Sequence, residues 1–113
     1  MKQVDKLSLS ELTEMAQKMY DPMVKAVVDL LKKKLVVDAE MHVDEEAWLL
    51  EQGSQQNDLW GINLYPHEFG TDKFIEYDSM INIRPRQQNP TRSIESTEIR
   101  EQIQTLVKEV VYE

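Results

Sequence analysis

The sequence predicts an α+β fold: a single small domain, residues 1–113, in which an antiparallel sheet is covered by helices on one face. Its 113 residues are enough for one modest core and too few for two ordinary domains. Stretches with helical and strand-like spacing follow one another in the order α-β-β-α-β-β-α, with no low-complexity linker between them. Antiparallel sheets commonly bury one face and leave the other in water, so we expect one buried sheet face.

The first helix is predicted to begin at Ser8. Ser8 and Glu11 have the spacing of a capping box, and Leu7 and Leu12 have the spacing of a hydrophobic staple. Apolar residues then recur at helical spacing. We expect the helix to end near residues 21–22, where an aspartate precedes a proline.

The segment from residue 23 to residue 43 fits two structures. Val24, Val27, Val28 and Leu31 have the spacing of a helical stripe. Its many β-branched residues favour instead two strands joined by a turn at the lysines 32–34. Of the two alternatives we prefer the hairpin.

A short helix is predicted to follow, with Asp44 as N-cap and Gly53 just beyond its end. Residues 58–66 are then predicted to form a strand that Pro66 stops. These features complete the first β-β-α unit and begin the second.

Residues 74–85 alternate almost strictly between apolar and polar side chains, which predicts another strand, ended by Pro85. A last helix is predicted to start with Ser96 or Thr97 as its cap. Its apolar face consists of five residues at helical spacing: Ile99, Ile103, Leu106, Val107 and Val110.

The stretches LWGINLYP and SMINIRP are distinctive. Together with MVKAVVD and EMHVD, they resemble an uncharacterised bacterial family known only as a domain of unknown function. The resemblance extends from about Met23 to Val107. In that family the first hairpin turn usually carries a glycine after a charged residue, whereas this chain has LKKK. The resemblance implies a compact single domain and no particular activity.

Composition excludes several classes of function. The net charge of −8 argues against general nucleic-acid binding, because the phosphate backbone favours positive surfaces. The chain has no cysteine, so disulfides, zinc–thiolate sites and thiol catalysis are excluded. It has neither the apolar region of a signal peptide nor an apolar run near the roughly 18 residues of a membrane span. We therefore expect a cytoplasmic protein with no membrane association.

A polar sheet face is the first candidate site. If the apolar rows of the predicted strands face the helices, five side chains share the opposite face: Glu40, His42, Asn63, Asn82 and Arg84. They offer an acid or base, amide donors and an anion clamp. The simpler interpretation is a solvated sheet face with weak cross-strand pairs, and we favour it.

A cluster of arginines is the second candidate site. Arg84, Arg86 and Arg92 precede the last helix, whose first amides attract anions. Guanidinium groups bind phosphate or carboxylate through two parallel hydrogen bonds. The competing interpretation, which we favour, is that these arginines hold the QQNPT loop in place.

A metal site has little support. His42 and Asp44 would point the same way from a strand, but such a site needs another histidine, and His67 lies in a predicted loop. We predict neither a metal nor a cofactor.

These observations predict a small cytoplasmic binding or interaction module without catalysis, with a protein partner or a second copy of itself. One alternative is a ligand-binding domain or enzyme that uses His42 as acid or base, Asn63 and Asn82 as donors, and Arg84 as clamp. Another is an anion or nucleic-acid contact through Arg84, Arg86 and Arg92. An enzyme requires a concave pocket where the reacting side chains converge.

Overall fold

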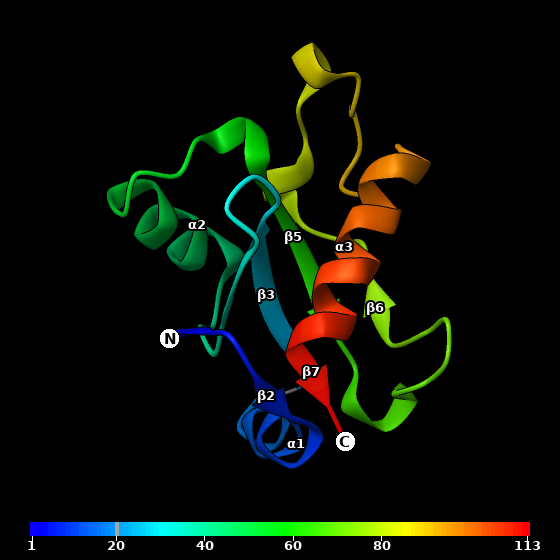
Figure 1. Ribbon diagram of the computed structural model, residues 1–113. Helices are drawn as coiled ribbons and strands as arrows, with labels where there is room; N and C mark the ends of the chain where they lie inside the picture. Colours follow the sequence, from blue (N-terminus) through cyan, green and yellow to red (C-terminus); the bar gives the residue numbers. More distant parts are fainter. Residues whose placement is uncertain (20) are drawn as a thin grey trace.

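The computed structural model describes residues 1–19 and 21–113, and Figure 1 shows their arrangement. The helices in this part of the chain are α1 (Leu9–Gln17), α2 (His42–Glu51) and α3 (Thr97–Val110). An antiparallel sheet has the order β1-β4-β3-β5-β6, with β1 (Lys2–Val4), β3 (Val24–Asp29), β4 (Lys34–Val37), β5 (Leu59–Leu64) and β6 (Ile75–Glu76). A parallel pair joins β2 (Leu7–Ser8) to β7 (Val111–Tyr112). The 3-10 helices are η1 (Gln56–Asp58), η2 (Pro66–Glu68), η3 (Met80–Asn82) and η4 (Pro85–Gln87).

The predicted α+β class and the order α-β-β-α-β-β-α are confirmed for the main elements. Three short strands at the two ends of the chain were not predicted. β1 pairs with β4, and β2 lies beside β7, where Lys6 Nζ also donates to the carbonyl of Glu109 at 2.6 Å. Strands of two or three residues carry too little periodicity to be recognised in a sequence.

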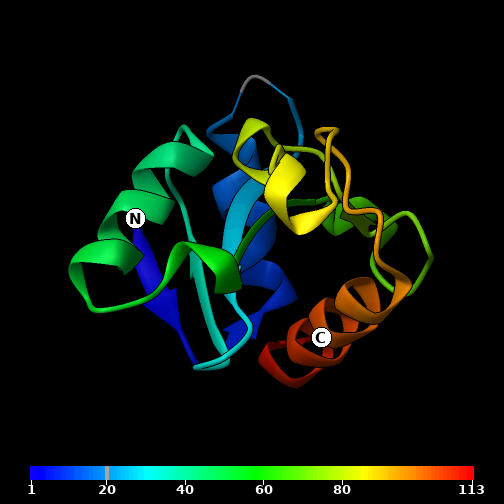
Figure 2. The same cartoon turned by 90° about the horizontal axis from the view of Figure 1, so that it is seen from above.

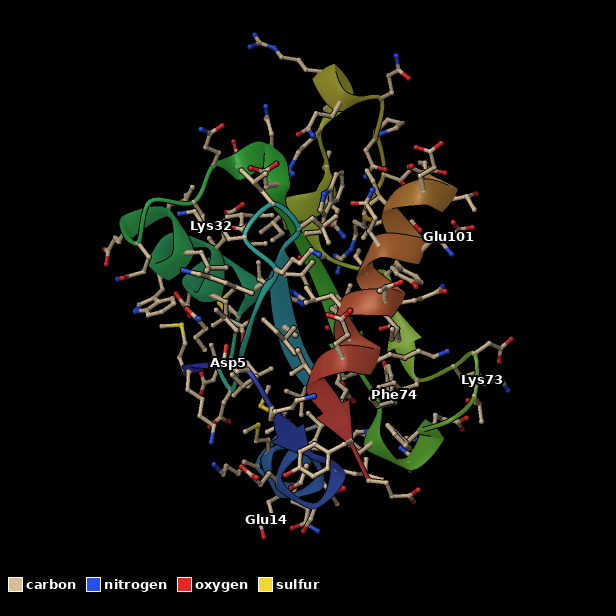
Figure 3. The ribbon with its side chains drawn as sticks, viewed as in Figure 1. Asp5, Glu14, Lys32, Lys73, Phe74 and Glu101 are labelled. Carbon is tan, nitrogen blue, oxygen red and sulfur yellow. The ribbon has the colours of Figure 1, made fainter. Side chains whose placement is uncertain are left out.

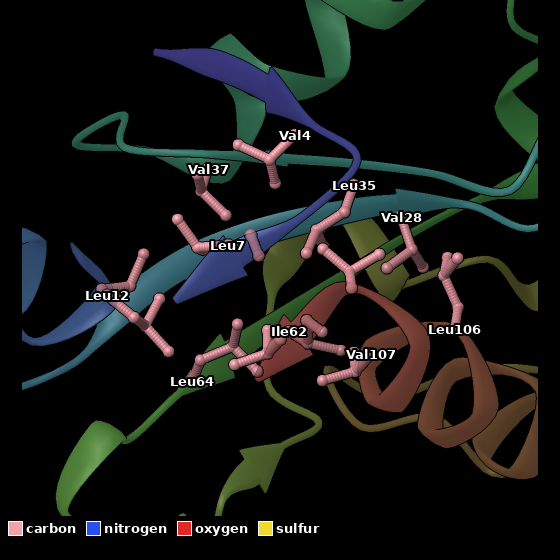
Figure 4. Packing of buried hydrophobic residues seen from close by; sticks show 14 of the residues in the cluster. Val4, Leu7, Leu12, Val28, Leu35, Val37, Ile62, Leu64, Leu106 and Val107 are labelled. Carbon is pink, nitrogen blue, oxygen red and sulfur yellow. The ribbon is translucent and has the colours of Figure 1, made fainter. Parts of the chain in front are cut away.

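Helices cover both faces of the sheet. Residues of α1 and α3 pack with one set of strand side chains, among them Val28, Leu35 and Ile62, in the main core (Figure 4). Leu49 of α2 packs with a second set, which includes Val27 and Val36. Figure 2 shows α2 and α3 on opposite sides of the strands. The expectation of helices on one face therefore holds for α1 and α3 and is corrected for α2, because the central strands are apolar on both faces.

The start of α1 follows its prediction. Ser8 is the N-cap, its Oγ accepts from the amide of Glu11 at 3.1 Å, and its hydroxyl donates to the Glu11 carboxylate. Leu7 and Leu12 are both fully buried, as expected of a hydrophobic staple. The helix ends at Gln17, earlier than predicted.

The hairpin alternative for the 23–43 segment is confirmed, since β3 and β4 pair from Ala26↔Val37 to Asp29↔Lys34. Asp29 closes the turn: its Oδ1 accepts from the amide of Lys32 at 2.9 Å, and its Oδ2 accepts from the hydroxyl of Ser54 at 2.5 Å. Lys33 has φ 54°, the left-handed conformation that favours glycine.

We expect Lys33→Gly to raise the free energy of unfolding by about 0.5–1 kcal/mol, because glycine adopts this φ without steric cost. Lys32→Gly is the matched control, and it should lower stability, since Lys32 has no positive φ to relieve. Urea denaturation measures both. Equal effects of the two substitutions would contradict the role assigned to the backbone of Lys33.

The second strand of the hairpin is shorter than predicted. It ends at Val37, because Asp38 adopts φ 69° and turns the chain out of the sheet. α2 then begins at His42, two residues before the predicted cap, and its N-cap Met41 makes no side-chain hydrogen bond. The end of α2 is as predicted: Gly53 has φ 96°, and its amide donates to the carbonyl of Leu50 at 3.1 Å.

The strand predicted for residues 74–85 is mostly wrong, because only β6 pairs with β5. After Asp78 the chain leaves the sheet: the Ser79 amide donates to the carbonyl of Arg92, and the Ser79 hydroxyl caps η3. The alternation in the sequence is real. In the folded loop of residues 79–95, which we call the asparagine loop, the predicted faces are reversed: Asn82 and Arg84 are buried, whereas Ile83 is exposed.

Candidate functional site

The predicted polar sheet face exists in part, and α2 covers it. Asn63 is buried on β5, and its Nδ2 donates to Glu76 Oε1 at 2.8 Å and to the carbonyl of Asp78 at 3.1 Å. His42 comes to this face from the first turn of α2 rather than from a strand. Glu40 stays outside it, exposed in the loop before α2.

The imidazole of His42 is packed against the sheet. Its Nε2 lies 2.8 Å from the carbonyl of Ile62, which requires Nε2 to carry a proton, and the Asn63 amide lies beside the ring. Burial lowers the pKa of His42 below its ordinary value of 6.5, although the Ile62 carbonyl acts in the opposite direction. The side chain is therefore neutral at pH 7 and fixed in one tautomer.

Two carboxyl groups of α2, which the helix buries, were not predicted as part of this face. Glu45 is fully buried, and its Oε2 accepts from the amide of Ala39 at 3.2 Å. Burial raises the pKa of Glu45 from 4.5 to about 9, so it is protonated at pH 7. Glu46 is also buried and lies 3.9 Å from Arg84 Nη2. An N-cap at Asp44 would place these two glutamates in the first turn of the helix, where carboxylates are common.

Asn82 lies in the asparagine loop and completes the edge of β5. Its Oδ1 accepts from the amide of Gly61 at 2.8 Å, and its Nδ2 donates to the carbonyl of Gly61 at 2.9 Å and to that of Arg92 at 3.1 Å. The register of β5 with β6 would place residue 78 opposite Gly61. The amide of Asn82 thus takes the place of a strand residue at this point.

Gly61 admits this arrangement because it has no side chain. A Cβ at this position would lie 2.6 Å from Ser79 Cβ and 2.7 Å from Ser79 Oγ. The glycine of LWGINLYP and the serine of SMINIRP are therefore in direct contact. This contact joins the two distinctive stretches of the sequence.

We expect Gly61→Ala to lower the free energy of unfolding by about 1–3 kcal/mol through overpacking. Ser79→Gly removes both clashing atoms, so the double variant should be less destabilised than the sum of the two single variants. Guanidinium denaturation of all four proteins completes the cycle. Strict additivity would show that the cost of Gly61→Ala has another cause.

Arg84 is buried and its guanidinium is fully engaged. Nη2 donates to the carbonyl of Leu59 and faces Glu46, and Nε donates to the carbonyl of Ile81 at 3.1 Å. Its Cζ lies 4.6 Å from the centroid of the Trp60 ring. Arg84 therefore ties α2, β5 and the asparagine loop together.

The other predicted arginines lie apart from Arg84. Arg92 is exposed and pairs with Asp78, with Nε 2.7 Å from Oδ1. Arg86 is exposed on η4. Asn89, which was not predicted, organises the loop: its Nδ2 donates to the carbonyls of Asn82 and Ser93 at 2.6 and 2.7 Å, and its Oδ1 accepts from the amide of Glu95.

The structure thus brings His42 and Asn63 together, and it buries Asn82 and Arg84 against different parts of β5, at Gly61 and at Leu59. The side chains of Glu40, Arg86 and Arg92 are exposed and do not join them. Among the hollows of the described chain are three with volumes of about 400, 510 and 660 Å³, and none of these three is lined by the seven residues.

One of these hollows has the character of a binding groove. It has a volume of about 660 Å³ and lies between α3 and residues 69–77, and we call it the α3 groove. Figure 3 shows Phe74 beside the C-terminal half of α3, between this helix and the loop that carries Lys73. The apolar residues that line the groove are Phe69, Phe74, Ile75, Val107 and Val111.

One wall of the α3 groove is fixed by contacts between α3 and Tyr77. Arg100 Cζ lies 4.4 Å from the centroid of the Tyr77 ring, and Gln104 Nε2 donates to the Tyr77 hydroxyl at 3.0 Å. Arg100 also donates from Nε to the carbonyl of Ile94 at 2.6 Å and from Nη2 to Ser93 Oγ at 2.9 Å. These bonds set the orientation of the guanidinium, and none of the hydrogen bonds found in the described part of the chain involves its Nη1.

The three hollows differ in charge. Arg100 and Lys108 line the α3 groove with one acid, Asp72. The hollow of about 510 Å³ beside the β3–β4 turn has Lys33 with three glutamates, and the third hollow has as many glutamates as lysines and histidines. Only the α3 groove of the three combines an excess of cations with a broad apolar lining. The sequence offered no signal for it, because its residues come from two separate segments, 69–77 and 100–111.

Residues 1–19 and 21–113 contain no group of three or more His, Cys, Asp or Glu side chains placed to hold a metal ion. No helix in this part of the chain has the length and apolar character needed to cross a membrane.

Comparison with protein families decides the family. The model of a protein of unknown function, DUF5674, matches residues 3–110. The chain belongs to the DUF5674 family. The match includes both distinctive stretches, the asparagine loop and all three helices, so the resemblance suggested by LWGINLYP and SMINIRP is confirmed. Neither the comparison with curated proteins nor that with solved structures finds a match.

Proposed function

We propose that this DUF5674 protein is a small cytoplasmic binding module without catalysis, and that the α3 groove is its ligand site. The observation that carries the proposal is the groove itself: a hollow of about 660 Å³ with an apolar lining and two cationic side chains, in a chain of net charge −8. Small-molecule sites have this size and this combination of apolar surface with a few fixed polar groups.

The environment of the predicted catalytic groups supports binding over catalysis. The His42 imidazole is hydrogen-bonded to the Ile62 carbonyl under α2. Arg84 donates hydrogen bonds to the carbonyls of Leu59 and Ile81. Neither histidine lines the α3 groove. A general acid or base must reach its substrate within hydrogen-bond distance, and these packed side chains act as structural groups.

A fragment screen by saturation-transfer NMR tests the proposal. We expect the wild-type protein to bind apolar fragments and Lys108→Trp to lose them, because an indole at this exposed position fills the groove. Arg86→Trp, a matched change on η4, should bind the same fragments as wild type. Retention of all fragments by Lys108→Trp, or no binding by the wild type, would overturn the proposal.

A further inference from the structure

We infer that the ligand of the α3 groove is an amphipathic monocarboxylate: an apolar chain or ring that bears a single carboxylate. This inference rests on the proposed function and specifies its ligand class. It follows from the donors that the groove fixes, from the number of these donors, and from the extent of the apolar lining.

The fixed donors come from Arg100 and Tyr77. The Arg100 guanidinium is held by Ile94, Ser93 and the Tyr77 ring, so its Nη1 needs no further ordering before it binds an anion. The Tyr77 hydroxyl accepts a hydrogen bond from Gln104, which leaves its own proton to donate. Two neighbouring donors of this kind match the two oxygens of one carboxylate.

Charge at the rim favours one negative charge over two. Lys108 is exposed on α3 and supplies a second, mobile cation. Asp72, also in the lining, opposes the approach of a dianion, as does the net charge of −8. A phosphate monoester carries up to two charges and needs more donors than Arg100 and Tyr77 provide.

The apolar lining sets the remainder of the ligand. Phe74, Val107 and Val111 are buried at the base of the groove, and Phe69 and Ile75 are half-buried beside them. Each methylene removed from water against such a surface strengthens binding about four-fold. An extended apolar body therefore contributes more to affinity than the carboxylate alone.

Isothermal titration calorimetry with four eight-carbon probes tests this inference. We expect octanoate to bind wild type at least ten-fold more tightly than octanamide or octylamine, and more tightly than octyl phosphate. Hexanoate should bind about fifteen-fold more weakly than octanoate, because it lacks two methylenes.

Two variants locate the head group. Lys108→Met should weaken the binding of octanoate by about three- to ten-fold and leave the binding of octanamide unchanged. Tyr77→Phe should also weaken the binding of octanoate, although it keeps the ring that supports Arg100. Arg86→Met is the control and should change neither affinity.

The outcomes separate the two proposals. Equal binding of octanoate and octanamide, or tighter binding of octyl phosphate, overturns the monocarboxylate and leaves the groove as a ligand site. If octanoate does not bind while other fragments bind the groove, the monocarboxylate is likewise overturned and the groove stays a ligand site. Absence of any binding to the groove overturns both.

Discussion

Asn82→Asp should lower the free energy of unfolding by about 3–5 kcal/mol at pH 7. The amide of Asn82 is fully buried and makes three hydrogen bonds, two of them as a donor to the carbonyls of Gly61 and Arg92. Aspartate has the same shape but loses both donors and places a buried negative charge against two carbonyl oxygens. Leaving buried polar groups and a buried charge without partners has a cost of this size.

The control for this prediction is Asn57→Asp, which makes the same chemical change at an exposed position. Denaturant unfolding should show a shift below 0.5 kcal/mol for it. The loss of unfolding free energy caused by Asn82→Asp should become smaller as the pH falls, because a protonated carboxyl regains one donor. Similar stability of the two variants at pH 7 would contradict the structural role of the Asn82 amide.

Glu45→Gln should raise the free energy of unfolding at pH 7 by up to about 3 kcal/mol. The folded protein holds the Glu45 proton up to a pKa of about 9, whereas the unfolded chain releases it near 4.5. Between these values each pH unit upward costs the folded state about 1.4 kcal/mol. Stability from this group is therefore complete below pH 4.5 and falls as the pH rises toward 9.

Glutamine keeps the acceptor for the Ala39 amide and has no proton to release. The increase in unfolding free energy produced by Glu45→Gln should therefore become larger from pH 5 to pH 8, as measured by urea unfolding at several pH values. Glu51→Gln, on the exposed side of the same helix, should give no pH-dependent gain. A constant difference between wild type and Glu45→Gln across this range would show that Glu45 is already ionised in the folded protein.

Periodicity and capping predicted the long elements of the fold. Ser8 and Ser96 cap their helices, and the apolar face of α3 is buried as expected. The β-branched residues of the 23–43 segment located the hairpin, and the run that Pro66 stops located β5. These signals succeed because each depends on residues close together in the chain.

The failures have a common physical cause. Asp38 ends β4 through its positive φ, and Asn82 replaces a strand through its side chain, so in both places the backbone departs from a pattern that the sequence still displays. The burial of Glu45 and Glu46 was not predicted, because glutamates after an N-cap at Asp44 are typical of a first helical turn, whereas α2 begins at His42 and packs both side chains inward.

The candidate sites illustrate the same limit. Arg84, Asn63 and Asn82 were recognised as unusual polar residues, and each is buried. These three side chains are rich in hydrogen-bond donors because they bond to backbone carbonyls of β5 and of the chain from Asp78 through the asparagine loop. The α3 groove depends on the docking of α3 against residues 69–77, a tertiary contact that no local pattern encodes.

The location of ligand binding distinguishes most directly between the α3 groove and the buried polar residues as the functional site. Amide chemical shifts of the ¹⁵N-labelled protein, followed during a titration with bound fragments, report it residue by residue. We predict shifts concentrated in residues 69–77 and in the part of α3 and β7 from Arg100 to Val111. Shifts concentrated instead in α2 and the asparagine loop, around His42, Asn82 and Arg84, would contradict the assignment of these residues to structure and of the α3 groove to function.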